Sequence, residues 1–196
     1  STIAVFGCAS RISETTPERP QTYYGSSKLK ADKELVAMSD REFKTAIIRP
    51  PMAYGGGMAP GNMLRLIRLV NKHIPLPFGS ARNSRDFINV KNLVEFIHLA
   101  VEKEVEGVFY PTDKVPYSTR NVIEEISRQL GVHTINLPSP SIFLKLVEKV
   151  RPDLYQKLWG DVVIDRQLAL SAIGYEPRYT LEDGIREMVE SFKQQK

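Results

Sequence analysis

Apolar positions in the first part of the chain alternate between short β-branched runs and a longer stretch with helical spacing. Residues 1–6 and 43–48 are apolar runs typical of buried strands. Between them, residues 11–20 are polar and contain two prolines, which predicts a loop. Residues 23–38 place apolar side chains among charged ones at the period of an amphipathic helix. The pattern therefore predicts the order strand, loop, helix, strand.

The same alternation continues beyond residue 60. Helical spacing predicts helices over residues 62–70, 90–101 and 118–130, and apolar runs predict extended segments at 86–89, 107–110 and 134–137. The last part is mainly helical, with predicted helices at 141–150, around 155–159, at 165–173 and from 180 to the C-terminus. Gly131 and Gly174 follow two of these helices, and Thr180 with Asp183 forms a capping-box-like start for the last one.

Strands that alternate with helices of about a dozen residues predict an α/β fold with a mostly parallel sheet. We expect the C-terminal part of a doubly wound, Rossmann-like sheet and, beside it, a smaller helix-rich lobe. We place residues 1–55 in the Rossmann-like domain. Residues 56–196 form mainly the lobe, with some elements returning to the sheet.

Composition narrows the classes of function. The 196 residues are 42% hydrophobic and carry a net charge of +4, but the basic residues are dispersed, and no nucleic-acid-binding motif accompanies them. Four arginines lie close together in the sequence and suit a diphosphate: Arg65, Arg68, Arg82 and Arg85. The single cysteine, the scattered histidines and the lack of a leader or long apolar run predict a cytoplasmic protein without metal or membrane.

Tyr24 and Lys28 are the first candidates for chemistry. Their spacing of four places both side chains on one face of the predicted helix. A phenol titrates near pH 10, but an adjacent ammonium favours its phenolate form. The pair is therefore a candidate acid/base. Alone, this spacing is weak evidence, because about one such pair arises by chance in a chain of this composition.

The context of the pair resembles the extended short-chain dehydrogenase/reductase family, which includes the sugar-nucleotide epimerases and dehydratases. The run Ser1-Thr2-Ile3-Ala4-Val5-Phe6-Gly7 precedes Tyr23-Tyr24-Gly25-Ser26-Ser27-Lys28, as the family's hydroxyl-bearing strand precedes its Tyr-x-x-x-Lys helix. The resemblance implies that Thr2 bonds the reacting sugar oxygen, that Tyr24 is the acid/base, and that Lys28 favours the phenolate and holds the cofactor ribose. Phe6 stands where the family usually has tyrosine.

Three later segments resemble the same family in the correct order. Arg49-Pro50-Pro51-Met52-Ala53-Tyr54-Gly55 is similar to a segment that passes the nicotinamide, which implies roles for Pro51 at the cofactor and Tyr54 at the substrate. Arg85-Asp86-Phe87-Ile88-Asn89-Val90-Lys91-Asn92 is similar to a segment whose arginine meets the nucleotide, with asparagine replacing the usual aspartate at its end. Gly174-Tyr175-Glu176-Pro177 is similar to a closing segment that usually holds tryptophan.

Several of these residues also have simpler roles open to them. Arg49 suits a loop anchor as well as a ligand contact, and Asn62 suits a helix cap as well as a substrate phosphate. Asp86 and Asp165 are better explained as caps of turns or helices than as catalytic acids. Three aromatic residues are expected to pack the helical lobe, namely Phe143, Tyr155 and Trp159.

The glycine-rich turn that binds a dinucleotide pyrophosphate is not found in the sequence. Residues 55–61 are glycine-dense, but their spacing is wrong and Pro60 removes a donor, so they predict a loop at the mouth of the site. We therefore expect on the order of a hundred residues before Ser1 in the parent protein. Alone, the fragment is expected to be inactive, to bind cofactor poorly and to favour a homodimer through an exposed sheet edge.

These observations predict an NAD-dependent enzyme that epimerises a nucleotide-linked sugar, most simply of the UDP-sugar 4-epimerase type, through a transient keto-sugar. NADP is the alternative cofactor. The alternative enzymes are an NADPH-dependent keto-sugar reductase and a sugar-nucleotide dehydratase. A dehydratase is disfavoured because Ile3 and Ala4, rather than acidic residues, follow Thr2. A different class, a non-catalytic fragment that serves only in binding, also stays open.

Overall fold

The computed structural model describes residues 1–57, 61–165, 167 and 173–195, and it divides into two compact units. The first unit comprises Ser1–Ala53, Asp86–Val115 and Val162–Arg178. The second unit comprises the remaining segments: Tyr54–Arg85, Pro116–Asp161 and Tyr179–Lys196. The domain division at residue 55 stays a prediction.

The first unit begins with a short 3-10 helix, η1 (Ile3–Phe6), where we predicted a strand over residues 1–6. The side chain of Thr2 caps this helix, because its Oγ1 accepts the backbone N–H of Ala4 at 3.2 Å. Val5 and Phe6 are buried in a cluster with Ile12, Leu29 and Ile164. The strand prediction was wrong because capping and burial outweigh the strand preference of β-branched residues.

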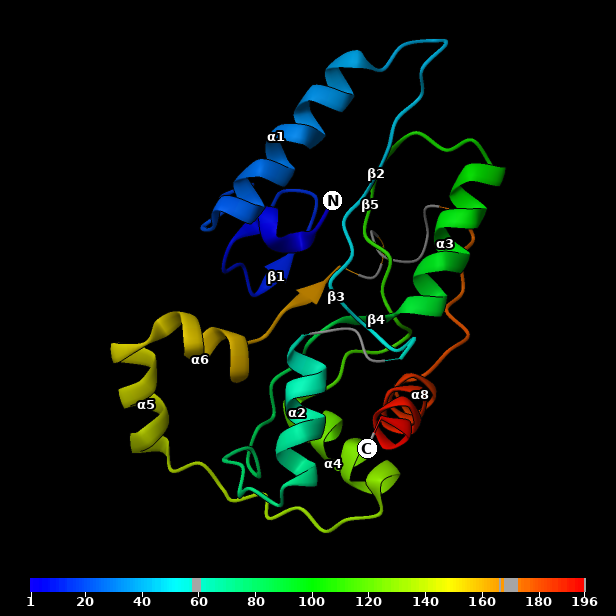
Figure 1. Ribbon diagram of the computed structural model, residues 1–196. Helices are drawn as coiled ribbons and strands as arrows, with labels where there is room; N and C mark the ends of the chain where they lie inside the picture. The colour runs from blue at the N-terminus through cyan, green and yellow to red at the C-terminus, as the bar shows by residue number, and fades with distance from the viewer. Residues whose placement is uncertain (58–60, 166, 168–172, 196) are drawn as a thin grey trace. The chain divides into compact units, whose positions relative to one another are not determined.

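Helix α1 (Tyr23–Met38) matches the predicted helix over residues 23–38 and lies beside η1 in Figure 1. The helix begins where predicted because Thr22 caps it: its side chain accepts the N–H of Gly25 at 3.1 Å. Only Gly25, Leu29 and Asp32 are buried. Most of the helix surface is therefore exposed in this chain, and the buried strip is narrow.

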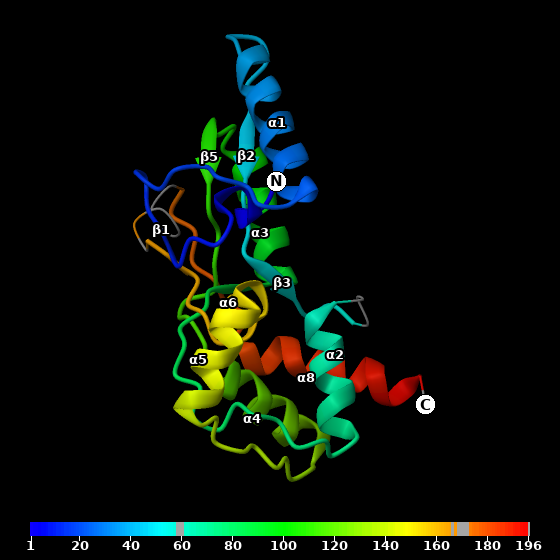
Figure 2. The ribbon, with the colours of Figure 1, turned by 90° about the vertical axis from the view of Figure 1, so that its left-hand side faces the viewer.

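The strands of the described residues form three separate pairs. Strand β2 (Ala46–Ile48) pairs in parallel with β5 (Gly107–Phe109), and the two run side by side in Figure 2. Strand β1 (Arg11–Ile12) pairs in parallel with β6 (Val163–Ile164). The third pair consists of β3 (Met52–Tyr54) and β4 (Phe87–Asn89). Parallel pairs with helices packed on them confirm the α/β fold.

Two of these strands were missed by the sequence analysis. Strand β1 begins the segment 11–20 that we predicted to be a loop throughout, and β6 lies between two predicted helices. Each strand has only two residues, which is too short to produce a period-2 pattern. Their pairing depends on distant residues: Val163 N donates to Ser10 O and Asp165 N to Ile12 O.

Helix α3 (Val90–Glu102) follows β4 directly, as predicted. Asn89 caps its N-terminus, because its side-chain oxygen accepts the N–H of Lys91 at 2.9 Å. The helix contributes to a second core cluster of the first unit, which consists of Phe96, Ala100, Phe109, Ile173 and Tyr175. The predicted helix over residues 165–173 lies mostly outside the described residues.

The second unit is built around three helices, α2 (Asn62–Asn71), α4 (Thr119–Leu130) and α8 (Leu181–Gln194). Helix α4 contacts both α2 and α8. Their facing residues form the core of the unit: Met63, Leu64, Ile67, Val70, Val122, Ile123, Ile126, Leu181, Ile185, Met188, Val189 and Phe192. Each helix buries residues at the three-and-four spacing that predicted it.

Two shorter helices complete the second unit, α5 (Ser141–Val150) and α6 (Pro152–Leu158), and they contact each other. The strand predicted over residues 134–137 was wrong, because only Asn136 forms a bridge, in parallel with Leu76. The rings of Tyr155 and Trp159 stack on each other, as expected, and Phe78 also packs on Trp159. The side chain of Phe143, the third aromatic residue expected here, lies outside the described part. No helix in the described part of the chain is long and apolar enough to cross a membrane.

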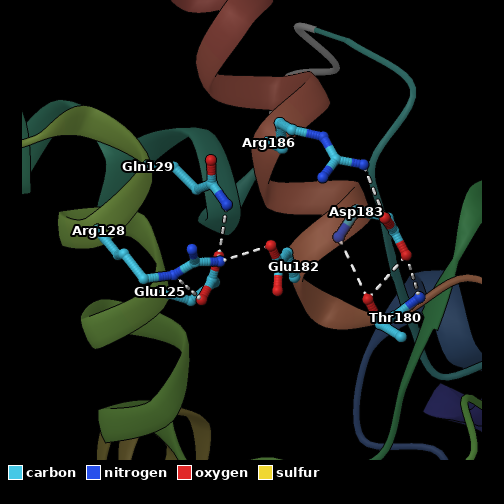
Figure 3. Close-up of polar contacts among 7 residues, drawn as sticks. All are labelled: Glu125, Arg128, Gln129, Thr180, Glu182, Asp183 and Arg186. Atoms are coloured by element: carbon cyan, nitrogen blue, oxygen red, sulfur yellow. Dashed lines mark hydrogen bonds and ion pairs between the residues drawn. The ribbon is translucent and has the colours of Figure 1, made fainter.

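The ends of α4 and α8 are joined by polar contacts (Figure 3). Gly131, in the left-handed conformation at φ 72°, ends α4 as predicted, and Thr180 with Asp183 forms the predicted capping box. Arg128 bridges the two helices, because it lies 2.7 Å from Glu125 and 2.9 Å from Glu182. Burial alone would raise the pKa of Glu125, but its bonds to Arg128 and Gln129 hold that pKa below its usual value.

Candidate functional site

The predicted tyrosine and lysine lie together on the exposed side of α1. The side chain of Tyr24 is 55% exposed, and Lys28 Nζ lies 5.8 Å from the centroid of its ring. The spacing of four residues therefore has the predicted result: an ammonium sits beside a phenol that solvent and a ligand can reach. This geometry suits a proton exchange that is assisted by a cation.

The first turn of α1 approaches the backbone of η1 closely. A Cβ atom added to Gly25 would lie only 2.7 Å from the carbonyl oxygen of Ala4 and 3.1 Å from Cβ of Pro20. Glycine is thus required here by lack of space. Because Gly25 follows Tyr24 and Ala4 lies two residues after Thr2, the first unit brings together the segments that carry Thr2 and Tyr24, two of the three predicted catalytic residues.

The segment around Pro51 lies against η1. The backbone N–H of Ile3 donates to the carbonyl of Pro50 at 3.3 Å, and Pro51 is buried. Arg49 N–H donates to Phe109 O at 2.8 Å, which continues the pairing of β2 with β5 beyond the strand ends. The two prolines end β2 as expected, because proline lacks the donor that a strand needs.

The sequence left two roles open for Arg49, a loop anchor and a ligand contact, and the structure shows the anchor. Its guanidinium is buried and bonds the carboxylates of Glu18 at 2.6 Å and Asp32 at 2.9 Å. Burial alone would lower the pKa of Arg49, but these two bonds raise it above its usual value. Sequence reasoning missed both partners. The available signal was the position of Asp32, four residues after Lys28 on α1.

The three residues predicted to bind substrate lie in the second unit or at its start. Tyr54 is buried at the end of β3, and Asn62 is the exposed first residue of α2. The cap of α2 is Gly61, and no side-chain bond caps the helix. The suggestion that Asn62 caps its helix was therefore wrong, because the chain enters the helix one residue earlier than that role requires.

Arg85 braces a turn of the second unit. Its Nη1 donates to the carbonyls of Gln156 at 2.9 Å and Gly160 at 2.7 Å. Its backbone N–H and C=O both pair with Tyr117. Burial lowers the pKa of Arg85, and the nearby Asp161 opposes this shift. Two backbone carbonyls thus hold the side chain in place, and no sequence pattern predicted these contacts.

Two departures from the family's usual residues, Asn92 and Tyr175, contact each other. Asn92 Nδ2 donates to the buried carboxylate of Asp113 at 2.7 Å, and its Oδ1 accepts the N–H of Arg178 at 3.0 Å. Tyr175 donates its hydroxyl to the backbone carbonyl of Asn92 at 3.0 Å. Burial, and then the charge of Asp113, raises the pKa of Tyr175. Asparagine suits this position because an aspartate would face Asp113 without a donor.

Two aspartates that were weighed as acids bond backbone groups instead. Asp86 Oδ2 accepts the N–H of Ile164 at 2.8 Å and so helps to hold β6. Asp165 Oδ1 accepts the N–H of Gln167 at 2.9 Å, a bond typical of a cap. These contacts agree with the simpler roles that the sequence favoured.

Comparison with known proteins connects this geometry to a family. Residues 1–110 match the model of the NAD dependent epimerase/dehydratase family. The chain is 35% identical over 181 residues to UDP-glucose 4-epimerase of Vibrio cholerae, a match that covers 89% of this chain and 55% of the relative. The chain therefore spans about half the length of this relative.

Solved structures show the same fold. The chain is similar to UDP-glucuronic acid 4-epimerase from Bacillus cereus in complex with NAD, with a TM-score of 0.76 and 23% identity over 99% of this chain and 60% of that one. It is also similar to the UDP-Glc/GlcNAc 4-epimerase from Campylobacter jejuni, with a TM-score of 0.70 and 22% identity over 99% and 63% of the two chains. At this identity the likeness concerns the fold.

Proposed function

Because the chain belongs to the NAD-dependent epimerase/dehydratase family, we propose that it is the catalytic and substrate-binding part of a nucleotide-sugar 4-epimerase. The observation that supports this most is the placement of Lys28 beside the exposed phenol of Tyr24, on a helix packed against the turn that Thr2 begins.

Each of the three residues then has its own task. The Thr2 oxygen already accepts the N–H of Ala4, which orients the side chain so that its hydroxyl can bond the reacting sugar oxygen. Tyr24 removes the proton from that sugar hydroxyl and later returns it. Lys28 favours the phenolate through its charge and holds the cofactor ribose. When bound, NAD supplies the acceptor and donor of the hydride.

The substrate proposed for the parent protein is a UDP-sugar, as in the relatives named above. Pro51 would border the nicotinamide, and Tyr54, Asn62 and Arg85 would contact the sugar nucleotide. The exposed Asn62 at the N-terminus of α2 suits a phosphate, because the first N–H groups of a helix favour anions. Epimerisation passes through a keto-sugar, and hydride returns to the opposite face.

A dehydratase is the second candidate within the family. Such an enzyme requires acidic partners beside the hydroxyl residue, whereas Ile3 and Ala4 follow Thr2 in η1. A keto-sugar reductase that uses NADPH is the third. The non-catalytic alternative predicts no turnover at all.

The test uses the full-length protein that contains this chain, incubated with UDP-glucose and NAD. A 4-epimerase converts the sugar to its 4-epimer without net consumption of NAD, which NMR of the sugar detects. A dehydratase yields a 4-keto-6-deoxy product, and a reductase consumes NADPH only with a keto-sugar. Thermal stabilisation by NAD, without any turnover of UDP-sugars, would support the binding module and contradict the proposal.

Lys28→Met is expected to lower kcat/KM of the full-length protein. The substitution removes the ammonium that lies 5.8 Å from the centroid of the Tyr24 ring and that is proposed to hold the cofactor ribose. The measurement is kcat/KM with the same UDP-sugar and NAD for the variant and the unchanged protein. Lys30→Met, on an exposed lysine two residues later, is the matched control and should leave kcat/KM unchanged. Unchanged kcat/KM in Lys28→Met would show that Lys28 is only a surface lysine.

Arg85→Ala is expected to raise KM while kcat is largely preserved. A contact to the nucleotide is made equally in the ground state and the transition state, so its loss weakens binding more than chemistry. The melting temperature should also fall, because two backbone carbonyls lose their donor. Arg85→Lys should recover only part of KM, since an ammonium lacks the planar fork. A lowered melting temperature with unchanged KM would leave Arg85 as a brace alone.

A further inference from the structure

We propose that Arg49 is a positioning residue for catalysis: by binding Asp32 it sets the rotation of α1, and through it the direction in which Tyr24 and Lys28 face the substrate. This inference rests on the proposed function and adds a residue to it. Arg49 itself is only 4% exposed and points into the first unit, so its action is indirect.

All three nitrogens of the Arg49 guanidinium bond partners, each on a different segment. Nε donates to Asp32 Oδ2 on α1 at 2.9 Å, and Nη2 lies 2.6 Å from Glu18 Oε1 in the loop before that helix. Nη1 donates to the hydroxyl of Tyr110 at 3.4 Å, just beyond β5. A planar group that is bonded on three sides cannot rotate without breaking a bond, so the orientation of the guanidinium is restricted.

Asp32 links the restricted orientation of Arg49 to Tyr24 and Lys28, because Asp32 lies on α1 with both of these residues. It lies four residues after Lys28 and eight after Tyr24, and at 3.6 residues per turn these offsets correspond to rotations of about 40° and 80° around the helix axis. Asp32 is 4% exposed and faces inward, whereas Tyr24 faces outward. A rotation of α1 that breaks the Asp32 bond therefore also turns both catalytic side chains.

The same cluster reaches the segment that carries Thr2. Ser1 Oγ donates to the carboxylate oxygen of Asp32 that Arg49 also binds, at 2.7 Å. The guanidinium carbon lies 5.5 Å from the ring centroid of Phe6, a cation–π contact at the other end of η1. Arg49 thus connects the segments of Thr2, Tyr24 and Pro51, and Phe6, the departure from the family's tyrosine, supplies an aromatic face to it.

Burying a charged cluster adds little net stability. The attraction within a buried ion pair barely offsets the free energy that the two charges lose when they leave water, and apolar residues of similar volume stabilise the packing at least as well. An apolar contact between α1 and β2 would, however, permit the helix to rotate or slide, whereas hydrogen bonds to a planar group do not. The orientation that the charged cluster imposes on α1 therefore explains it better than the stability that it adds.

The experiment measures kcat, KM and melting temperature for Arg49→Lys in the full-length protein. An ammonium keeps the charge but cannot bond all three partners, so kcat should fall roughly tenfold while KM changes little. Glu18→Gln, at a side chain 31% exposed, is the milder variant and should show a smaller fall of the same kind. Arg128→Met is the matched control: it breaks exposed ion pairs in the other unit, so it should leave kcat unchanged.

The decisive measurement repeats Arg49→Lys in a Tyr24→Phe background. If Arg49 acts through Tyr24, the second substitution lowers the residual turnover much less than tenfold, because the group that it positions is already gone. Multiplicative losses would show a general structural role and overturn the proposal, as would unchanged kcat in either folded single variant. If Tyr24→Phe alone retains full turnover, the proposed function fails instead, which separates the two.

Discussion

Tyr24→Phe in the full-length protein is expected to lower kcat by roughly 10²-fold or more. The substitution removes only the hydroxyl that exchanges the proton with the sugar. The side chain is 55% exposed, so the fold loses little by the change. The melting temperature should stay close to that of the unsubstituted full-length protein. The affinity for UDP-sugar should also change little, because binding does not depend on proton transfer.

The control for this variant is Tyr23→Phe. Tyr23 precedes Tyr24 on the same helix and is 97% exposed, so it tests the loss of a hydroxyl without the proposed chemistry. Turnover is measured for both variants with the same UDP-sugar and NAD. Full turnover in Tyr24→Phe, or an equal loss in both variants, would remove Tyr24 from its assigned role.

Gly25→Ala is expected to lower kcat on the order of 10²-fold, although alanine is the better helix former. Replacing glycine by alanine inside a helix normally stabilises it by about 0.5–1 kcal/mol. Here the new Cβ would lie 2.7 Å from the carbonyl oxygen of Ala4, a backbone atom that cannot rotate away. The first turn of α1 must then move from η1, which separates Tyr24 from Thr2, and misplacements of about 1 Å are costly in catalysis.

The control for this variant is Ser26→Ala, one residue further along α1 at an exposed position. It changes a side chain on the same turn without the close approach and should leave kcat unchanged. The melting temperature of Gly25→Ala should fall despite the improved helix propensity. If both kcat and melting temperature match or exceed those of the parent protein, the contact between α1 and η1 does not position the site.

Sequence patterns alone determined several of the described helices and the spacing of the proposed catalytic pair, Tyr24 and Lys28. Helix α4 follows from its apolar periodicity and from Gly131 at its C-terminal end, and α1 lies where predicted although Leu29 is its only buried apolar side chain. The neighbourhood of Tyr24 and Lys28 likewise follows from a spacing of four on a helix. Such features depend on residues that are close in sequence, so the order of residues contains them.

Only the tertiary structure decided the features that join distant segments. A β-branched run became η1 because Thr2 caps it and a core of remote residues buries it, and the two-residue strands β1 and β6 exist only through each other. The position of Arg49 in the chain does not predict its ion pairs with Asp32 and Glu18. Folding buries Arg49 and Asp32 together, and the requirement that buried charges be paired then determines their contact, with the partly exposed Glu18 as a further partner of Arg49.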